Sequence, residues 1–198
     1  QPFKTDDSGD ERMLQMALAR LRQLSAHEIG HTLGLSHNFS SSASGRSSVM
    51  DYPHPLITGD NDDLNFDIAY DTKIGAWDKW AIKYGYGYPS VNSNEKNFLQ
   101  TTLERTLEDG YEFISDADAR DPSGVHPRAH LWDNGVSASD ELLRLLELRK
   151  QRMESFNVEA IKPGVSQSML EEVFVPLYLM HRYQIEAAIK LIGGLDFK

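Results

Sequence analysis

The sequence predicts a mainly helical fold, and three observations support this prediction. Apolar residues recur three and four positions apart between Asp10 and Leu33, which is the rhythm of an amphipathic helix. Residues 139–156 are rich in leucine, glutamate and arginine, which favour helices. Patterns typical of strands are rare, and the one short strand that we expect covers residues 111–114. We therefore expect helices to build the core.

The first predicted helix begins near Asp10, where Ser8 and several aspartates can cap its N-terminus. Its apolar residues form a stripe along one side. We expect this stripe to pack in the core: Met13, Met16, Ala17, Leu21, Leu24, Ile29 and Leu33.

The same helix carries the sequence HEIGHTLGLSH at residues 27–37. Residues four apart on a helix lie about 40° apart around its axis and about 6 Å apart along it, so His27 and His31 can hold one metal ion. Gly34 can adopt the left-handed conformation that ends a helix, and His37 then returns to the same ion. Three imidazole ligands leave one position of a tetrahedron for water, as in a catalytic zinc site.

Glu28 lies next to the first of these ligands. A zinc-bound water has a pKa of about 7, and a nearby carboxylate can accept its proton as the water attacks a carbonyl. The motif therefore predicts zinc as the cofactor and Glu28 as a general base. A surface helix that carried histidines by chance would have no need of the glycine at its end.

Turn and breaker residues divide the rest of the chain into further helices. We expect helices at residues 74–84, 94–108 and 139–156, and a last helix that begins at a capping box between Ser168 and Glu171 and runs to Leu191. Pro176 lies within this last helix and predicts a kink or a split near Val175.

Two loops carry groups that could bind metal ions, and a role without metal is favoured for both: a solvated turn at residues 58–65, and surface or structural side chains at His126 and His130. Residues 58–65 include Asp60–Asp63, which could offer oxygen ligands to calcium, but the EF-hand glycine is missing and a solvated turn is favoured. His126 and His130 lie four residues apart, but Pro127 between them interrupts the helix that such a pair needs.

Residues 27–37, together with SVMDYP at 48–53, resemble the signatures of the metzincin clan of zinc endopeptidases, whose second motif is a methionine-bearing turn beneath the metal. With residues 73–86 (KIGAWDKWAIKYGY) and 178–194 (YLMHRYQIEAAIKLIGG), the chain resembles over nearly its whole length a family of bacterial secreted zinc metalloproteases, the Met-zincin domain. The first two motifs carry chemistry, whereas the later two contribute only similarity.

The resemblance implies roles for the residues of this Met-turn. Met50 is expected as a packing floor rather than a ligand, because thioether sulfur is soft and zinc is borderline. Tyr52 resembles a swinging fifth ligand that also steadies the oxyanion, and a buried tyrosine that packs in the turn is the alternative. His54 is expected on the wall of the cleft. The resemblance also implies export, hence a secreted, periplasmic or cell-surface location.

Metzincin catalytic domains resemble one another in having a twisted sheet upstream of the zinc helix, and one of its strands pairs with the substrate backbone. Those strands do not fit into residues 1–9, so we expect this chain to be the C-terminal part of a catalytic region whose upstream part is its partner. A complete minimal protein with a different upper wall is the alternative. The uncovered side of the first helix is expected to favour self-association.

Composition excludes several classes of partner. The net charge is −10 and the pI is near 5.1, which argues against nucleic acid and against anionic membrane surfaces. The chain has no cysteine, hence no disulfide and no thiolate zinc site, and no apolar run reaches the roughly 18 residues of a membrane span. Without repeats or long linkers, residues 1–198 are expected to form one compact unit. Residues 1–110 carry the active-site helix and Met-turn, and residues 111–198 form a helical C-terminal region.

These observations predict a zinc-dependent endopeptidase that hydrolyses peptide bonds of a peptide or protein substrate. His27, His31 and His37 hold the zinc, Glu28 is the base and later passes its proton to the leaving amine, and Tyr52 assists. A zinc-retaining binding or scaffold module is an alternative, although such a module has no use for a base. An inactive fragment of a larger metalloprotease is the other alternative.

Overall fold

The computed structural model describes residues 7–59, 64–90, 94–120 and 124–197, and it confirms a mainly helical fold. Seven α-helices appear in the described residues: α1 (Asp7–Thr32), α2 (Ala76–Tyr86), α3 (Glu95–Glu108), α4 (Asp116–Ala119), α5 (Ala138–Glu154), α6 (Met169–Tyr178) and α7 (Arg182–Ile189). Two 3₁₀ turns, η1 (Ser42–Ser44) and η2 (Val158–Ala160), and an antiparallel pair of two-residue strands, β1 (Thr58–Gly59) and β2 (Leu64–Asn65), complete them. None of the described helices is long and apolar enough to cross a membrane.

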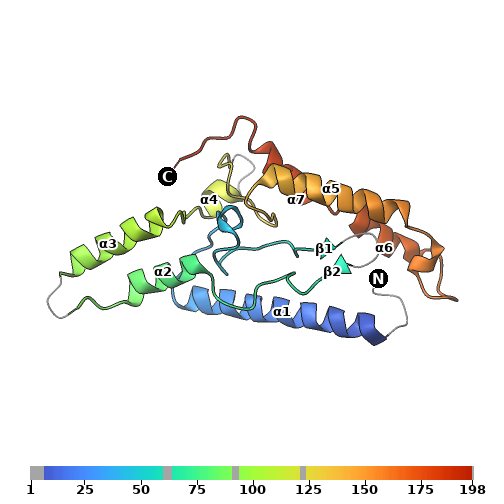
Figure 1. Ribbon diagram of the computed structural model, residues 1–198, viewed down its shortest axis with the longest axis horizontal. Helices are drawn as coiled ribbons and strands as arrows, with labels where there is room; N and C mark the ends of the chain where they lie inside the picture. Colours follow the sequence, from blue (N-terminus) through green and yellow to red (C-terminus); the bar gives the residue numbers. More distant parts are fainter. Residues whose placement is uncertain (1–6, 60–63, 91–93, 121–123, 198) are drawn as a thin grey trace.

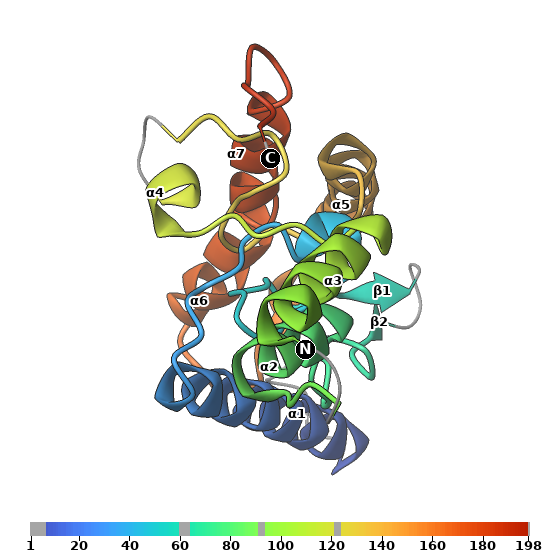
Figure 2. The same cartoon turned by 90° about the vertical axis from the view of Figure 1, so that its left-hand side faces the viewer.

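Helix α1 lies along one edge of the molecule in both views (Figures 1 and 2). Its buried face is formed by Ala19, Gln23, His27 and Gly30, so it is largely polar. The expectation that the apolar stripe packs in the core is wrong at four positions: Ala17 is exposed, Leu21 and Ile29 are each 58% exposed, and Leu33 is 39% exposed. Polar contacts, rather than burial of the apolar stripe, place this helix.

The predicted glycine ends α1. Gly34 has a left-handed backbone with φ of 84°, and its N–H donates to the carbonyl of His31 at 2.9 Å. The N–H of Leu35 reaches back to the carbonyl of Gly30 at 3.0 Å. This pair of bonds is the Schellman arrangement, which a left-handed glycine makes possible. It turns the chain sharply, and residues 35–37 lead back toward the buried face of the helix.

Two apolar clusters of buried residues flank the segment after α1. One contains Phe39, Ile114, Ala119, Ala129 and Leu131, with Tyr52 packed against it, and the other contains Val49, Met50 and Trp77. Both clusters draw on residues 38–52, so this segment joins the two. Helix α2 packs against α3, and α5 packs against α6 and α7 (Figure 1).

Three local predictions need correction. Residues 111–114 form no strand, although the N–H of Phe39 donates to the carbonyl of Ile114 at 2.8 Å. The predicted split of the last helix is present, but it falls at residues 179–181 rather than near Val175, since α6 continues through Pro176. Ser168 makes no capping bond. The acidic residues Asp60–Asp63 lie outside the described residues, between β1 and β2.

Candidate metal centre

Three histidines meet at the C-terminal end of α1. A metal ion needs several His, Cys, Asp or Glu side chains close together, and within the described ranges one such group of three is present: His27, His31 and His37. Their ligand atoms all lie within 4.8 Å of one another. The Nε2 atom of His31 lies 3.1 Å from that of His27 and 3.2 Å from that of His37. The ring of His31 is nearly perpendicular to both others, at 88° and 83°. The three predicted ligands therefore converge through the same ring nitrogen.

The two helical histidines are oriented by backbone carbonyls. Nδ1 of His27 lies 2.7 Å from the carbonyl oxygen of Val49, and Nδ1 of His31 lies 2.9 Å from that of Leu35. A carbonyl accepts only, so both Nδ1 atoms must carry the proton and both Nε2 atoms present lone pairs. Burial lowers the pKa of His27, and the neighbouring imidazoles lower it further, which keeps this ring neutral.

The third histidine is oriented by a carboxylate. Nδ1 of His37 donates to Asp116, at 2.8 Å from Oδ2 and 3.1 Å from Oδ1. Partial burial alone would raise the pKa of Asp116, but its bond with His37 and the positive charge of Arg120 bring that pKa below its usual value. Asp116 is thus a charged acceptor, and the Nε2 of His37 is left as a third lone pair.

Three unprotonated nitrogens this close repel one another unless a cation lies between them. Neutral imidazoles oriented through their outer nitrogens are the donor set that zinc prefers. The three histidines therefore fit a zinc ion. The Nδ1 atom of each ring is already bonded to an oxygen, which leaves Nε2 to bind the metal.

Glu28 and Tyr52 differ in their contacts with this centre. Glu28 is exposed on α1 and follows His27, about 100° further around the helix axis. The phenol oxygen of Tyr52 lies 3.1 Å from Nε2 of His37, and its ring packs 4.7 Å from that of His27. Tyr52 also packs against a core cluster.

Met50 lies directly beneath α1. It is fully buried, and a Cβ atom at Gly30 would come 2.2 Å from its Sδ atom. The second variable position of the HExxH motif, Gly30, therefore favours glycine, because a Cβ atom there would collide with the methionine below it. The sequence analysis assigned Gly30 no role, and only the packing of the Met-turn against the helix reveals one.

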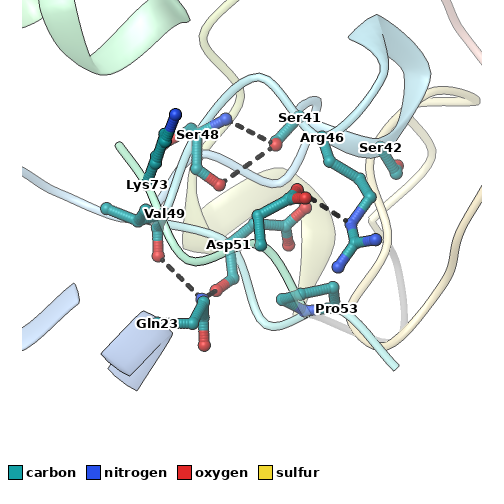
Figure 3. A pocket seen from close by; sticks show the side chains of 10 residues that line it. Gln23, Ser41, Ser42, Arg46, Ser48, Val49, Asp51, Pro53 and Lys73 are labelled. Atoms are coloured by element: carbon teal, nitrogen blue, oxygen red, sulfur yellow. Dashed lines mark hydrogen bonds and ion pairs between the residues drawn. The ribbon is translucent and has the colours of Figure 1, made fainter. Parts of the chain in front are cut away.

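Helix α1 is hydrogen-bonded to the Met-turn through Gln23. The Nε2 atom of this buried side chain donates to the carbonyl of Val49 at 3.2 Å (Figure 3), while Arg20 bonds to its Oε1 atom. The Ser41 hydroxyl accepts from the N–H of Ser48 at 2.9 Å and donates to the carbonyl of Ser48 at 3.2 Å. Figure 3 shows both bonds. The carbonyl oxygen of Val49 therefore accepts hydrogen bonds from both Gln23 and His27, the first predicted metal ligand.

Asp78 of α2 holds the other side of the turn. Its carboxylate accepts from Ser48 Oγ at 2.6 Å, from Val49 N–H at 2.9 Å and from Gly75 N–H at 2.6 Å. A Cβ atom at Gly75 would come 1.8 Å from the carbonyl oxygen of Ser47, so the helix can approach this closely only with glycine there. Asp78 is a site-supporting residue that the sequence analysis missed, and an acidic residue in a first helical turn was its only signal.

A buried pair of acids lies behind the Met-turn. Asp51 accepts from the N–H of Tyr52 at 2.7 Å, and Asp133 accepts from Ser42 Oγ at 2.9 Å. Burial raises the pKa of Asp51 well above its usual range, and the charge of Asp133 adds to this. Burial also raises the pKa of Asp133 to about 7, although the bond from Ser42 opposes the shift.

The remaining histidines singled out from the sequence stay apart from the metal centre. His54 lines a cavity of about 410 Å³ together with residues that include Val175, Leu177, Met180, Arg182 and Tyr183. His126 is fully buried and bonds to the carbonyl of Phe197 at 3.0 Å, whereas His130 pairs with Glu186 at 3.2 Å. The latter two have partners from the C-terminal part of the chain.

Comparison with known proteins gives one match. Residues 9–198 fit the model of a protein family described as Met-zincin. No curated protein and no solved structure matches the chain. The matched span includes nearly all of α1, the three histidines and the methionine turn.

Proposed function

The chain belongs to the Met-zincin family, and from this premise we propose that it is a zinc-dependent endopeptidase whose metal centre is the three-histidine group. One observation carries the proposal. The Nε2 atoms of His27 and His37 lie 3.1 and 3.2 Å from that of His31, and each of the three rings has an acceptor at its opposite nitrogen. A carboxylate, Glu28, immediately follows the first ligand on the same helix.

The chemistry assigns a role to each side chain. A bound zinc ion supplies Lewis acidity, which polarises a carbonyl and lowers the pKa of water. The three histidines hold the ion through Nε2. Glu28 accepts a proton from the attacking water and passes it to the leaving amine. The phenol of Tyr52 donates a hydrogen bond to the negative charge that develops on the substrate oxygen.

The proposal extends to the setting of the enzyme. We propose a peptide or protein substrate, a location outside the cytoplasm, and an upstream part of the catalytic region as a partner. The exposure of Leu21, Ile29 and Leu33 supports such a partner, because these side chains leave an apolar surface on α1 within the described part of the chain.

The test combines zinc content with peptide hydrolysis. The wild-type chain should bind about one zinc ion, and His37→Ala should lose it. Glu28→Gln should keep the zinc and lower the hydrolysis rate by about 10²- to 10⁴-fold, because it removes only the base. Glu11→Gln, an exposed glutamate on the same helix, is the matched control and should retain the wild-type rate.

Two outcomes would contradict the proposal. Hydrolysis that survived Glu28→Gln would make the assigned base wrong. A chain that holds zinc but cleaves none of a broad set of fluorogenic peptides would favour the alternatives without turnover, which are the zinc-retaining module and the inactive fragment.

A further inference from the structure

The three ligands are oriented in two different ways. His27 and His31 belong to a continuous helix, and each Nδ1 donates to a backbone carbonyl. His37 lies in the chain after the helix has ended, where no helical backbone fixes its ring. It alone of the three donates to a side chain, the carboxylate of Asp116, which lies 79 residues further along the chain.

Asp116 is itself fixed at the start of α4. Arg120 lies one turn on, with a guanidinium nitrogen 3.3 Å from Oδ1, and the Ser115 hydroxyl lies 3.3 Å from Oδ2. The same guanidinium stands 5.7 Å from the centre of the Tyr52 ring. Since the Tyr52 hydroxyl contacts His37, the contacts run in a closed ring from His37 through Asp116, Arg120 and Tyr52 back to His37.

We infer that Asp116 is the positioning residue of the metal centre, which fixes the tautomer and the direction of His37 and strengthens it as a ligand. The inference rests on the proposed zinc centre. A carboxylate behind an imidazole makes the opposite nitrogen more basic, whereas a backbone carbonyl supplies orientation with less charge. The ligand with the least backbone support thus has the strongest acceptor.

An ordinary surface ion pair is the competing explanation. The Asp116 side chain is 41% exposed, and exposed pairs contribute little to stability. The two explanations differ in what they change. A surface pair would leave zinc affinity untouched, whereas a positioning residue would change affinity more than it changes the folding of the metal-free chain.

The experiment measures the zinc dissociation constant of the full 198-residue chain by chelator competition, and the melting temperature of the metal-free chain. Asp116→Ala removes both charge and acceptor and should weaken zinc binding by about 10- to 100-fold. Asp116→Asn keeps an acceptor oxygen and should lie between Asp116→Ala and wild type. Asp118→Asn and Asp118→Ala are the matched controls, since they remove the same charge from the same turn, and they should stay within about twofold of wild type.

Cobalt substitution gives a second readout. The visible absorption of bound Co²⁺ reports its coordination, and we expect Asp116→Ala to shift or weaken this spectrum while both Asp118 variants preserve it. Asp116→Asn decides the question if Asp116→Ala does not fold.

Three results would overturn the inference. The first is a zinc affinity of Asp116→Ala equal to that of Asp118→Ala. The second is a lower melting temperature of the metal-free Asp116 variants with unchanged zinc affinity. The third is a wild-type chain that takes up no zinc, which would remove the proposed function as well, whereas the first two leave that function standing.

Discussion

The two faces of α1 differ in a way that reverses the usual amphipathic helix. The inward face presents Gln23, His27 and Gly30 to the Met-turn, and the outward face presents Leu21 and Ile29 to solvent. The inward contacts are few and specific. The Gln23 hydrogen bond needs its acceptor at one place, and Gly30 leaves room for one neighbouring side chain. The face of α1 that supports the candidate metal centre is therefore not the face that its hydrophobic pattern predicts to be buried.

The largest effect should come from the carboxylate that holds the turn against the inward face. Asp78→Ala leaves the buried Val49 and Gly75 N–H groups without their acceptor, and each bond to a charged group is worth about 1.5–3 kcal/mol. We expect a loss of at least about 3 kcal/mol in the free energy of unfolding, measured with denaturant. An equal loss in Asp67→Ala, at an exposed position, would contradict this role.

The next effect tests the close approach of helix and turn. Gly30→Ala places a Cβ atom against the Sδ of Met50, and such overpacking costs about 1–3 kcal/mol despite the better helix propensity of alanine. Gly85→Ala in α2 is the control, since no atom lies within 4 Å of the added Cβ. It should leave unfolding unchanged or raise its free energy by up to about 1 kcal/mol. If both variants behaved alike, the contact with Met50 would not constrain α1.

A smaller, pH-dependent effect should come from the acids behind the turn. The pKa of Asp133 is raised to about 7 in the folded chain, so between about pH 4 and pH 7 the folded state binds the proton that the unfolded state has lost. Stability from this group is therefore present below pH 4 and is lost as the pH rises to about 7. Asp133→Asn should make the melting temperature less dependent on pH in this window, and the measured quantity is this slope rather than the stability at one pH. An unchanged pH profile would contradict the raised pKa.

The smallest effect on folding should come from the outward face. Leu21→Lys combined with Ile29→Lys removes apolar groups that contact little, and the free energy of unfolding should change by less than about 0.5 kcal/mol per site. Self-association should nevertheless fall, as measured by light scattering over a range of concentrations. Leu107→Lys on α3, at a residue that is 61% exposed, is the control. An equal fall in the control would mean that association is not specific to α1.

The features that the sequence predicted are local ones. The zinc motif, the left-handed Gly34 and the helices at 94–108 and 139–156 each depend on residues within a few turns of one another. Propensity, spacing and breaker residues therefore predict them, and the boundaries differ by one or two residues.

The features that the sequence did not predict depend on distant partners. Asp78 reaches a turn 29 residues before it, and Asp116 reaches a histidine 79 residues before it. An aspartate in a first helical turn looks the same in sequence whether it caps its own helix or supports another segment. The buried face of α1 was mistaken for the same reason, since its polar residues are buried only because the turn provides their partners.

The bond between His37 and Asp116 also has a consequence for the order of assembly during synthesis. His27 and His31 can come together as soon as α1 has left the ribosome, whereas the acceptor for His37 follows 79 residues later. In the proposed centre, a metal ion that arrived early would therefore meet two helical ligands and a third without its acceptor, and the centre would be complete only after α4 had formed. Tight metal retention would then require a chain that has been translated and folded well past the motif itself.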